Sequence, residues 1–153
     1  MIKAPSTYQA SVVIAAFSRK STVASFITRV FTGASRWSHC GIVDTSRDVV
    51  IEALMFKGVV ETPLDEWKSR RHTFEFVEIA CPDPHAAIRF ARVQLGESYD
   101  YLGALGAPFR APWGRNGRWY CSELLESALA VAGRRRWRLD RRGVSPAESY
   151  MVL

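Results

Sequence analysis

Cys121 stands where a catalytic thiol is expected, at the start of a segment with a helical pattern. The sequence predicts a helix over Cys121–Ala132, and the aromatic residues Trp119 and Tyr120 precede it. A thiol at a helix N-terminus faces the positive end of the helix dipole, which favours the thiolate and lowers the thiol pKa. Because the thiolate is the nucleophilic form, Cys121 is the first candidate for covalent catalysis.

A thiol nucleophile works best beside a base that takes its proton and a third group that orients the base. The sequence offers three histidines, His39, His72 and His85. His39 is preferred because it lies in an apolar, strand-like segment, and Glu52 interrupts a second apolar segment that follows it. A buried carboxylate needs a partner, which His39 could provide. A Glu52 that faces solvent and a structural His39 are the alternatives.

The segments that must position His39 and Glu52 are predicted to form a β-hairpin. Two β-branched segments flank a short polar turn, and a two-residue loop would pair Asp44 with Arg47. Counting back along both strands then sets His39 directly opposite Glu52, with Cβ atoms about 4.5–5.5 Å apart. The turn lacks an Asn-Gly or Asp-Gly signature, and a slip of one residue would put the two side chains on opposite faces.

The rest of the pattern alternates strands and helices within one domain, residues 1–153. Further strands are predicted at 11–17, 58–62 and 73–79, and further helices at 21–33, 62–67 and 85–95. Thr62 is the predicted N-cap of the short helix, with Pro63 at its first position. The segment 96–118 is rich in Gly, Pro and aromatic residues and is predicted to be one long loop that leads into Cys121.

The other two cysteines are expected to be structural. Cys40 neighbours His39, so on a strand it points to the opposite face and into the core. Cys81 precedes Pro82 at the end of a predicted strand. Three widely spaced cysteines make no disulfide framework, and the absence of a Cys-x-x-Cys pair argues against a structural zinc site. We therefore expect reduced thiols and neither a metal nor a cofactor.

Composition and charge bound the class of protein. A hydrophobic content of 48% is enough for a real core and excludes a disordered chain. The formal net charge is +6, and arginines gather late in the sequence. These arginines are Arg134, Arg135, Arg136, Arg138, Arg141 and Arg142. They could hold an anionic partner or simply form a solvated face. A specific nucleic-acid partner is not expected, because no recognisable binding module is present.

Neither a membrane span nor a signal peptide is evident in the sequence. No apolar run approaches the roughly 20 residues of a membrane-spanning helix. The early run Val12–Phe17 is shorter than the about 7–15 residues of a typical signal-peptide core, and no clear cleavage site follows it. We expect a cytoplasmic protein, or one that reaches the cell envelope by another route, as a phage-encoded protein would.

Three ordered segments carry a family resemblance. They are 38–43 (Ser-His-Cys-Gly-Ile-Val), 50–53 (Val-Ile-Glu-Ala) and 120–124 (Tyr-Cys-Ser-Glu-Leu). With the histidine strand first and the cysteine helix last, they resemble the circularly permuted papain-like amidases of the NlpC superfamily, of the YiiX/YaeF type. The resemblance covers roughly residues 11–148. It implies an α+β fold in which an antiparallel sheet packs against the helix that bears the nucleophile.

The resemblance also implies an activity. Carried over onto matching positions, it makes Cys121 the nucleophile, His39 the base and Glu52 the polar group that orients the base. The implied enzyme is a cysteine amidase or peptidase that works through an acyl-enzyme, with the peptide amides of bacterial peptidoglycan as the first substrate class.

Three residues near the nucleophile are candidates for substrate binding or for the oxyanion site. Tyr99 matches the tyrosine of the family's Gly-x-x-Tyr segment, which lines the site, and simple aromatic packing is its alternative role. Tyr120 and Ser122 flank Cys121. The backbone N–H of Cys121 is a further candidate donor to an oxyanion.

Two other functions stay open at this point. Relatives similar to lecithin:retinol acyltransferase use the same permuted site on lipid acyl groups, as hydrolases or acyltransferases. Tryptophan and phenylalanine residues around the site would fit an acyl groove or an ordinary core. A non-catalytic binding module that uses the arginine-rich run is the alternative from another class. The sequence leaves the substrate bond and the oligomeric state open.

Overall fold

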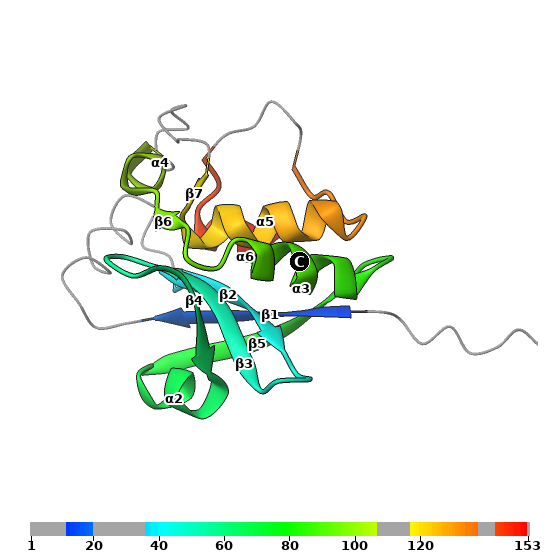
Figure 1. Cartoon of the computed structure of the whole chain (residues 1–153), viewed down its shortest axis with the longest axis horizontal. Helices are drawn as coiled ribbons and strands as arrows, with labels where there is room; N and C mark the ends of the chain where they lie inside the picture. The colour runs from blue at the N-terminus through cyan, green and yellow to red at the C-terminus, as the bar shows by residue number, and fades with distance from the viewer. Residues whose placement is uncertain (1–11, 20–35, 107–116, 138–142, 153) are drawn as a thin grey trace, which may run out of the picture.

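An antiparallel sheet of five strands is the centre of the fold (Figure 1). The computed structural model describes residues 12–19, 36–106, 117–137 and 143–152. The strand order is β4-β3-β2-β1-β5, and every pairing is antiparallel. The strands are β1 (Val12–Arg19), β2 (His39–Asp44), β3 (Val49–Leu54), β4 (Gly58–Pro63) and β5 (Thr73–Ala80). The helix predicted over 21–33 lies outside the described residues.

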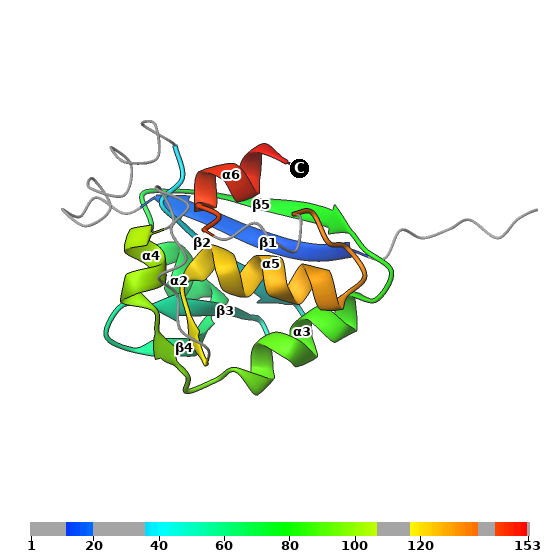
Figure 2. The same cartoon turned by 90° about the horizontal axis from the view of Figure 1, so that it is seen from above.

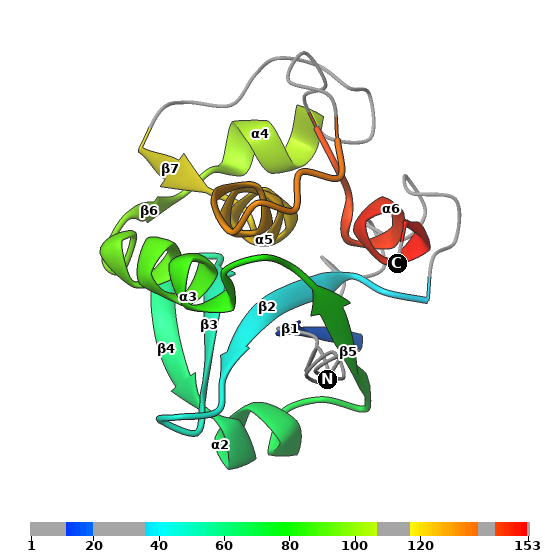
Figure 3. The ribbon, with the colours of Figure 1, turned by 90° about the vertical axis from the view of Figure 1, so that its right-hand side faces the viewer.

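Helices cover both faces of the sheet. They are α2 (Leu64–Ser69), α3 (Pro84–Val93), α4 (Tyr101–Gly106), α5 (Cys121–Val131) and α6 (Pro146–Met151). Seen from above, α3 and α5 run side by side across the sheet, and α6 lies beside β5 (Figure 2). The side view places α3, α5 and α6 on one face and α2 on the other (Figure 3). The predicted α+β architecture is therefore confirmed in the described part of the chain.

Helix α5 closes the main core, and its prediction from the sequence is confirmed within one residue of its end. The buried apolar residues of α5 share one helix face: Leu124, Leu125, Ala128 and Leu129. They join one apolar cluster with inward-facing side chains of the sheet, such as Phe17 and Ile42. This packing fixes the N-terminus of α5, and with it Cys121, against the sheet.

A smaller apolar cluster occupies the opposite face of the sheet. Val43 of β2 and Val50 of β3 pack there against Trp67 of α2, whose side chain is fully buried. Glu52 lies on the same face of β3 as Val50, because residues two apart on a strand share a face. One carboxylate is thus placed on an apolar face, where it must find polar partners.

The turn of the β2–β3 hairpin differs from its prediction. Asp44 lies opposite Val49 instead of Arg47, and the turn takes four residues rather than two. The Asp44 carboxylate accepts hydrogen bonds from the backbone N–H and the hydroxyl of Ser46, at 2.9 and 2.6 Å. Asp48 completes the turn with a φ of 57°. Such side-chain turns depend on local Asp and Ser contacts, which strand periodicity does not contain.

The predicted register of the β2–β3 hairpin is wrong by two residues, but each side chain still lies on the predicted face of the sheet. Side chains alternate along a strand with a period of two, so an even offset leaves the buried set unchanged. His39 and Glu52 are no longer directly opposite, but they still share a face as diagonal neighbours. Diagonal neighbours about 7–8 Å apart are within reach of long side chains.

Glycine at position 41 allows the two central strands to approach closely. A Cβ atom on Gly41 would lie 2.7 Å from Val50 Cγ1 and 3.3 Å from Glu52 Cβ. Val50 is β-branched and has little rotamer freedom to move away. We expect Gly41→Ala to lower the free energy of unfolding by about 1–3 kcal/mol. Urea unfolding would measure this, and a stability equal to that of the wild type would contradict the close approach.

Segments near both ends of α5 hold structure that the sequence patterns did not predict. The predicted loop 96–118 contains α4, and β6 (Ser98–Tyr99) pairs in parallel with β7 (Arg118–Trp119). Positions 107–116 of that loop lie outside the described residues. In the C-terminal segment, Ser145 and Glu148 form a capping box that begins α6. None of the described helices has the length and hydropathy to cross a membrane.

Candidate active site

Cys121 is the first residue of α5 and is nearly buried, with 7% of its surface exposed. Tyr120 is the N-cap in an extended conformation. Its side chain is also held, because its hydroxyl accepts a hydrogen bond of 3.2 Å from the backbone N–H of Val144. The thiol is therefore fixed at the positive end of a helix whose start is well packed.

His39 contacts Cys121 with one part of its ring and Glu52 with another. Its Nε2 atom lies 2.6 Å from Glu52 Oε2, and its side chain is 14% exposed. The Cys121 thiol lies near enough to the ring for a hydrogen bond and its negative charge to raise the pKa of His39. Since Nε2 is engaged by Glu52, Nδ1 is the atom that remains for the thiol. The predicted contact of His39 with Glu52 is present despite the shift in register.

The site spans both faces of the sheet. Cys40 packs in the main core on the α5 side, together with Cys121. Glu52 lies on the α2 side, in contact with Trp67. His39 is the first residue of β2, and its ring touches groups from both sides at this end of the strand. The sheet thus separates the nucleophile from the carboxylate, and the imidazole joins them.

Glu52 is 1% exposed and accepts hydrogen bonds at both carboxylate oxygens. Besides His39, its Oε2 accepts from Trp67 Nε1 at 3.0 Å and from Arg71 Nη2 at 2.7 Å. Its Oε1 accepts from the Thr62 hydroxyl at 2.8 Å. The Arg71 guanidinium also stacks over the Trp67 ring, 4.9 Å from its centroid. The buried charge of Glu52 is therefore fully compensated, and the carboxylate has one orientation.

These contacts set the charges of the site. Burial alone would raise the pKa of Glu52, but hydrogen bonds from His39 and Thr62 and the charges of His39 and Arg71 lower it to about 2. Burial alone would lower the pKa of His39, but hydrogen bonds with Cys121 and Glu52 and the negative charge on both raise it to about 9. At neutral pH, an ionised Glu52 thus faces a protonated His39.

A hydrogen bond from the Cys40 thiol is the largest cause that holds the pKa of Cys121 well below the usual value. Burial opposes this effect, and the hydrogen bond and charge of His39 add to it. Burial and the neighbouring Cys121 thiolate raise the pKa of Cys40, which stays protonated. Cys40 is fully buried, as predicted for a core thiol, but it also contacts the nucleophile. The site can therefore hold a thiolate beside an imidazolium.

The three cysteines are free, and their environments differ. Burial raises the pKa of Cys81 and of Cys40, whereas that of Cys121 is lowered. Iodoacetamide near pH 7 is expected to label Cys121 before the other two, because the thiolate is the reactive form. Peptide mapping by mass spectrometry would measure the order. Faster labelling of Cys40 or Cys81 would contradict the proposed thiolate.

The predicted substrate-binding residues have different roles in the structure. Tyr99 lies close enough to Cys121 for the thiolate to contribute, after burial, to the raised pKa of its hydroxyl. The Ser122 side chain is fully buried and donates to the carbonyl of Val144, so its hydroxyl faces the start of α6. Tyr120 likewise uses its hydroxyl to hold this segment. Of the three side chains, Tyr99 is the one whose hydroxyl has no structural partner in the described residues, and a role in substrate binding stays a prediction for it.

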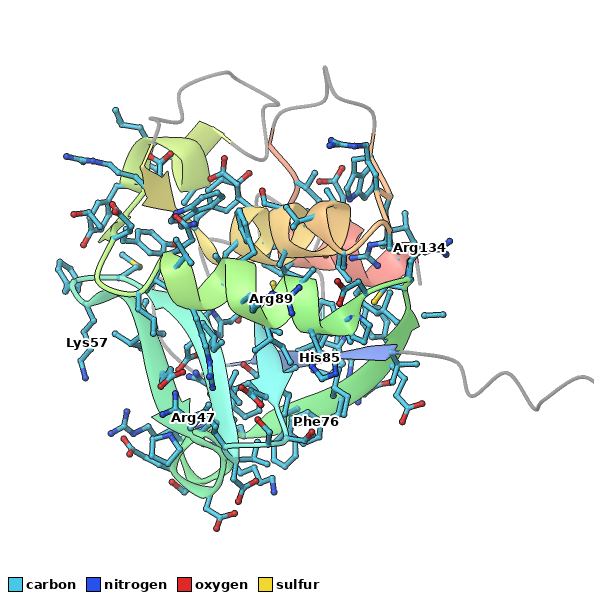
Figure 4. The ribbon with its side chains drawn as sticks, turned by 45° about the vertical axis from the view of Figure 1, so that its right-hand side comes forward. Arg47, Lys57, Phe76, His85, Arg89 and Arg134 are labelled. Carbon is cyan, nitrogen blue, oxygen red and sulfur yellow. The ribbon has the colours of Figure 1, made fainter. Side chains whose placement is uncertain are left out.

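The other two histidines are not brought to the site. His72 is exposed in the connection between α2 and β5. His85 lies in the first turn of α3 on the helical side of the molecule (Figure 4). Neither residue hydrogen-bonds to Cys121 or Glu52 in the described part of the chain.

Sequence reasoning missed three groups that hold Glu52. Thr62 was assigned as a helix N-cap, but it belongs to β4, and Pro63 is the residue that precedes α2. The Thr62 hydroxyl is free for Glu52 because it caps no helix. Trp67 and Arg71 carried no recognisable motif. A buried carboxylate requires hydrogen-bond donors. Trp67 in the next predicted helix and Arg71 shortly after it carry such donors, and this was the signal that could have identified them.

The arginine-rich run divides into members with different environments. Arg134, at the end of α5, is exposed, as is Arg135 (Figure 4 labels Arg134). Arg136 does not belong to an anion-binding surface, because its buried guanidinium pairs with Glu126 and donates to Ser149. Positions 138, 141 and 142 lie outside the described residues. Binding of an anionic partner by the exposed arginines stays a prediction.

The similarity of this chain to known proteins lies in its fold. In the described residues, no group of three or more His, Cys, Asp or Glu side chains is arranged to hold a metal ion. No family model and no curated protein matches the sequence. The chain is similar to the crystal structure of metalloprotein YiiX from Escherichia coli O157:H7. The TM-score is 0.62 at 21% identity, over 86% of this chain and 71% of that chain. The fold is therefore YiiX-like: an α+β arrangement around a five-stranded antiparallel sheet.

Proposed function

We propose that the protein is a cysteine hydrolase that cleaves an amide bond through an acyl-enzyme, on a circularly permuted papain-like domain. The observation that carries the proposal is the continuous contact from the Cys121 thiol through His39 to Glu52. The YiiX-like fold supports it, since the sequence resemblance is to the YiiX/YaeF type. The order of the three residues in the chain fits the permuted arrangement, with the histidine before the cysteine.

In the first half of the reaction, the Cys121 thiolate attacks the carbonyl carbon of the substrate and a C–S bond forms. The His39 imidazolium gives its proton to the leaving nitrogen as the C–N bond breaks. An acyl-thioester on Cys121 and a free amine result. In the second half, His39 takes a proton from water, the hydroxide attacks the thioester, and the thiolate leaves. Glu52 holds the Nε2 side of the ring throughout, so that Nδ1 keeps facing the sulfur.

The start of α5 supplies donors for the oxyanion that forms during attack. The first hydrogen bond of the helix runs from the N–H of Leu124 to the carbonyl of Tyr120. The preceding N–H groups, at Cys121 and Ser122, have no partner within the helix, as at any helix N-terminus. These two N–H groups are candidate oxyanion donors, and the Tyr99 hydroxyl is a third candidate.

Exposed apolar side chains near Tyr99 favour a second candidate, a lipid acyl hydrolase or acyltransferase that uses the same thiol. Phe56 is 88% exposed at the tip of the β3–β4 hairpin, and its backbone N–H donates to the Tyr101 hydroxyl at 2.8 Å. The rings of Tyr101 and Tyr99 are in contact, with centroids 5.1 Å apart. Leu102 and Leu105 of α4 are exposed beside them. Such a patch would suit an acyl chain.

The two substrate classes can be separated by their products. The protein would be incubated with purified peptidoglycan and, separately, with phospholipid vesicles, and the products analysed by mass spectrometry. New amine and carboxyl ends in stem peptides would support the amidase, and released fatty acid or transferred acyl groups would support the second candidate. In both cases an acid-quenched sample should contain an acyl group on Cys121. The absence of product and of acylated Cys121 with both substrates would overturn the proposed function.

A further inference from the structure

Arg71 is buried behind the proposed site, although arginine is a residue type that almost always lies at the surface. It follows α2, and only 2% of its side chain is exposed. Its Nη2 atom lies 2.7 Å from Glu52 Oε2, the same oxygen that His39 approaches to 2.6 Å. The guanidinium also stacks on Trp67, which holds its plane in place. Arg71 does not touch the thiol, so any effect on chemistry passes through Glu52.

Four ionisable groups follow one another with alternating charge. They are the Cys121 thiolate, the His39 imidazolium, the Glu52 carboxylate and the Arg71 guanidinium, and each contacts the next. Without the guanidinium, the other three would carry one uncompensated negative charge in a buried site, which is costly. With it, the chain of charges is neutral.

We propose that Arg71 is a positioning residue for the reaction: its buried charge balances Glu52 and keeps that carboxylate ionised against His39, beside the Cys121 thiol. This inference rests on the proposed function, because it assigns Arg71 a role in the reactivity of Cys121. Trp67 and Thr62 complete the arrangement by holding the guanidinium plane and the second oxygen of Glu52.

Other charged groups interact more weakly with these four ionisable groups. Arg70 repels Arg71 from the adjacent position, but it is about half exposed and pairs with Glu66 on α2. On the helical side, Cys40 hydrogen-bonds to Cys121 and stays protonated. The hydroxyl of Tyr99 is also near, and burial raises its pKa well above the usual value. In the described residues, Glu52 thus pairs directly with two cations, Arg71 and His39.

The inference predicts the pH dependence of two groups. Removing a positive charge makes loss of a proton harder at every nearby group. In Arg71→Met, the pH at which Cys121 becomes half reactive and the pH at which His39 loses its proton should both rise, by about one pH unit. His39 should show the larger shift, since it shares an oxygen of Glu52 with Arg71. A residue with only a structural role would change stability and leave both midpoints in place.

The experiment follows iodoacetamide labelling of Cys121 against pH, and the imidazole NMR signal of His39, in the free protein. Arg71→Lys keeps the charge and should restore both midpoints to wild-type values. Arg70→Gln removes a neighbouring but exposed charge and is the matched control, with both midpoints expected to stay. Unchanged midpoints in a folded Arg71→Met protein would overturn the inference.

If Arg71→Met does not fold, Glu52→Gln is compared with Glu52→Gln/Arg71→Met. The pH at which Cys121 is half reactive should then be higher in the double variant than in Glu52→Gln, because the cation is lost. Equal values in the two variants would overturn the inference. Because labelling needs no substrate, this test is independent of turnover. A wild-type Cys121 that reacts only at high pH would count against the proposed function itself, whereas unmoved midpoints count against Arg71 alone.

Discussion

Replacing Cys121 with alanine is expected to abolish turnover while the protein stays folded. The variant lacks the nucleophile of the proposed mechanism, so kcat should fall by about four orders of magnitude or more. The fold should survive, because the side chain loses one sulfur atom and α5 remains packed through its buried leucines. Product formation and circular dichroism would be measured on the same sample. Full activity in this variant would exclude the proposed mechanism.

Cys81→Ala is the matched control for this experiment. Cys81 is also a free, buried thiol of the main core, but its pKa is raised and it takes no part in the contacts of His39. Its replacement removes the same sulfur atom from the core and should cost about 1 kcal/mol or less of stability. Turnover should remain close to that of the wild type, which separates the loss of a nucleophile from the loss of a core thiol.

Glu52→Gln is expected to cause the largest loss of stability. The substitution keeps the shape of the side chain but leaves the buried Arg71 without its counter-charge. Breaking a buried, hydrogen-bonded pair in this way costs about 3 kcal/mol or more. Chemical denaturation at pH 7 would measure the loss. Glu78→Gln, at an exposed position of β5, is the control and should change stability by no more than about 0.5 kcal/mol.

The wild type and Glu52→Gln should also differ in how their stability depends on acidic pH. The pKa of Glu52 is about 2 in the folded protein and 4.5 in a model peptide. A lowered pKa stabilises the fold above pH 4.5, and that contribution is lost as the pH falls towards 2. The wild type should therefore lose stability over this range by about 3 kcal/mol more than Glu52→Gln does. Parallel stability curves for the two proteins across this range would contradict the buried ion pair.

The sequence predicted the parts of the fold that depend on periodicity and on local signals. The apolar stripe of α5, and the cap Asp83 with Pro84 at the first position of α3, were sufficient to place both helices. The alternation of side chains put His39 and Glu52 on one face, which survived an error of two residues in register. The helix α6 was missed although its capping box is visible in the residues, because its single turn and a half carries no clear apolar stripe.

The environment of Glu52 depends on contacts between distant segments, which no local pattern contains. Thr62, Trp67 and Arg71 come from a strand, a helix and a loop that meet only when α2 folds back on the sheet. Cys40 was expected to point away from His39, and its side chain does face the other side of the sheet. The sequence could not show that α5 would bring Cys121 to that same side.

The division of the site by the sheet has a consequence for how the protein can be altered. Groups that would meet a substrate lie on the α5 side, whereas the carboxylate and guanidinium lie on the α2 side. Residues of α4 and the β3–β4 hairpin can thus vary with little effect on the acidity of the thiol, whereas Tyr99 of β6 lies near the thiolate. Changes around Trp67 and Arg71 would instead tune the working pH and leave substrate choice intact. Directed evolution could therefore treat the selectivity and the pH optimum of the proposed hydrolase as two separate traits.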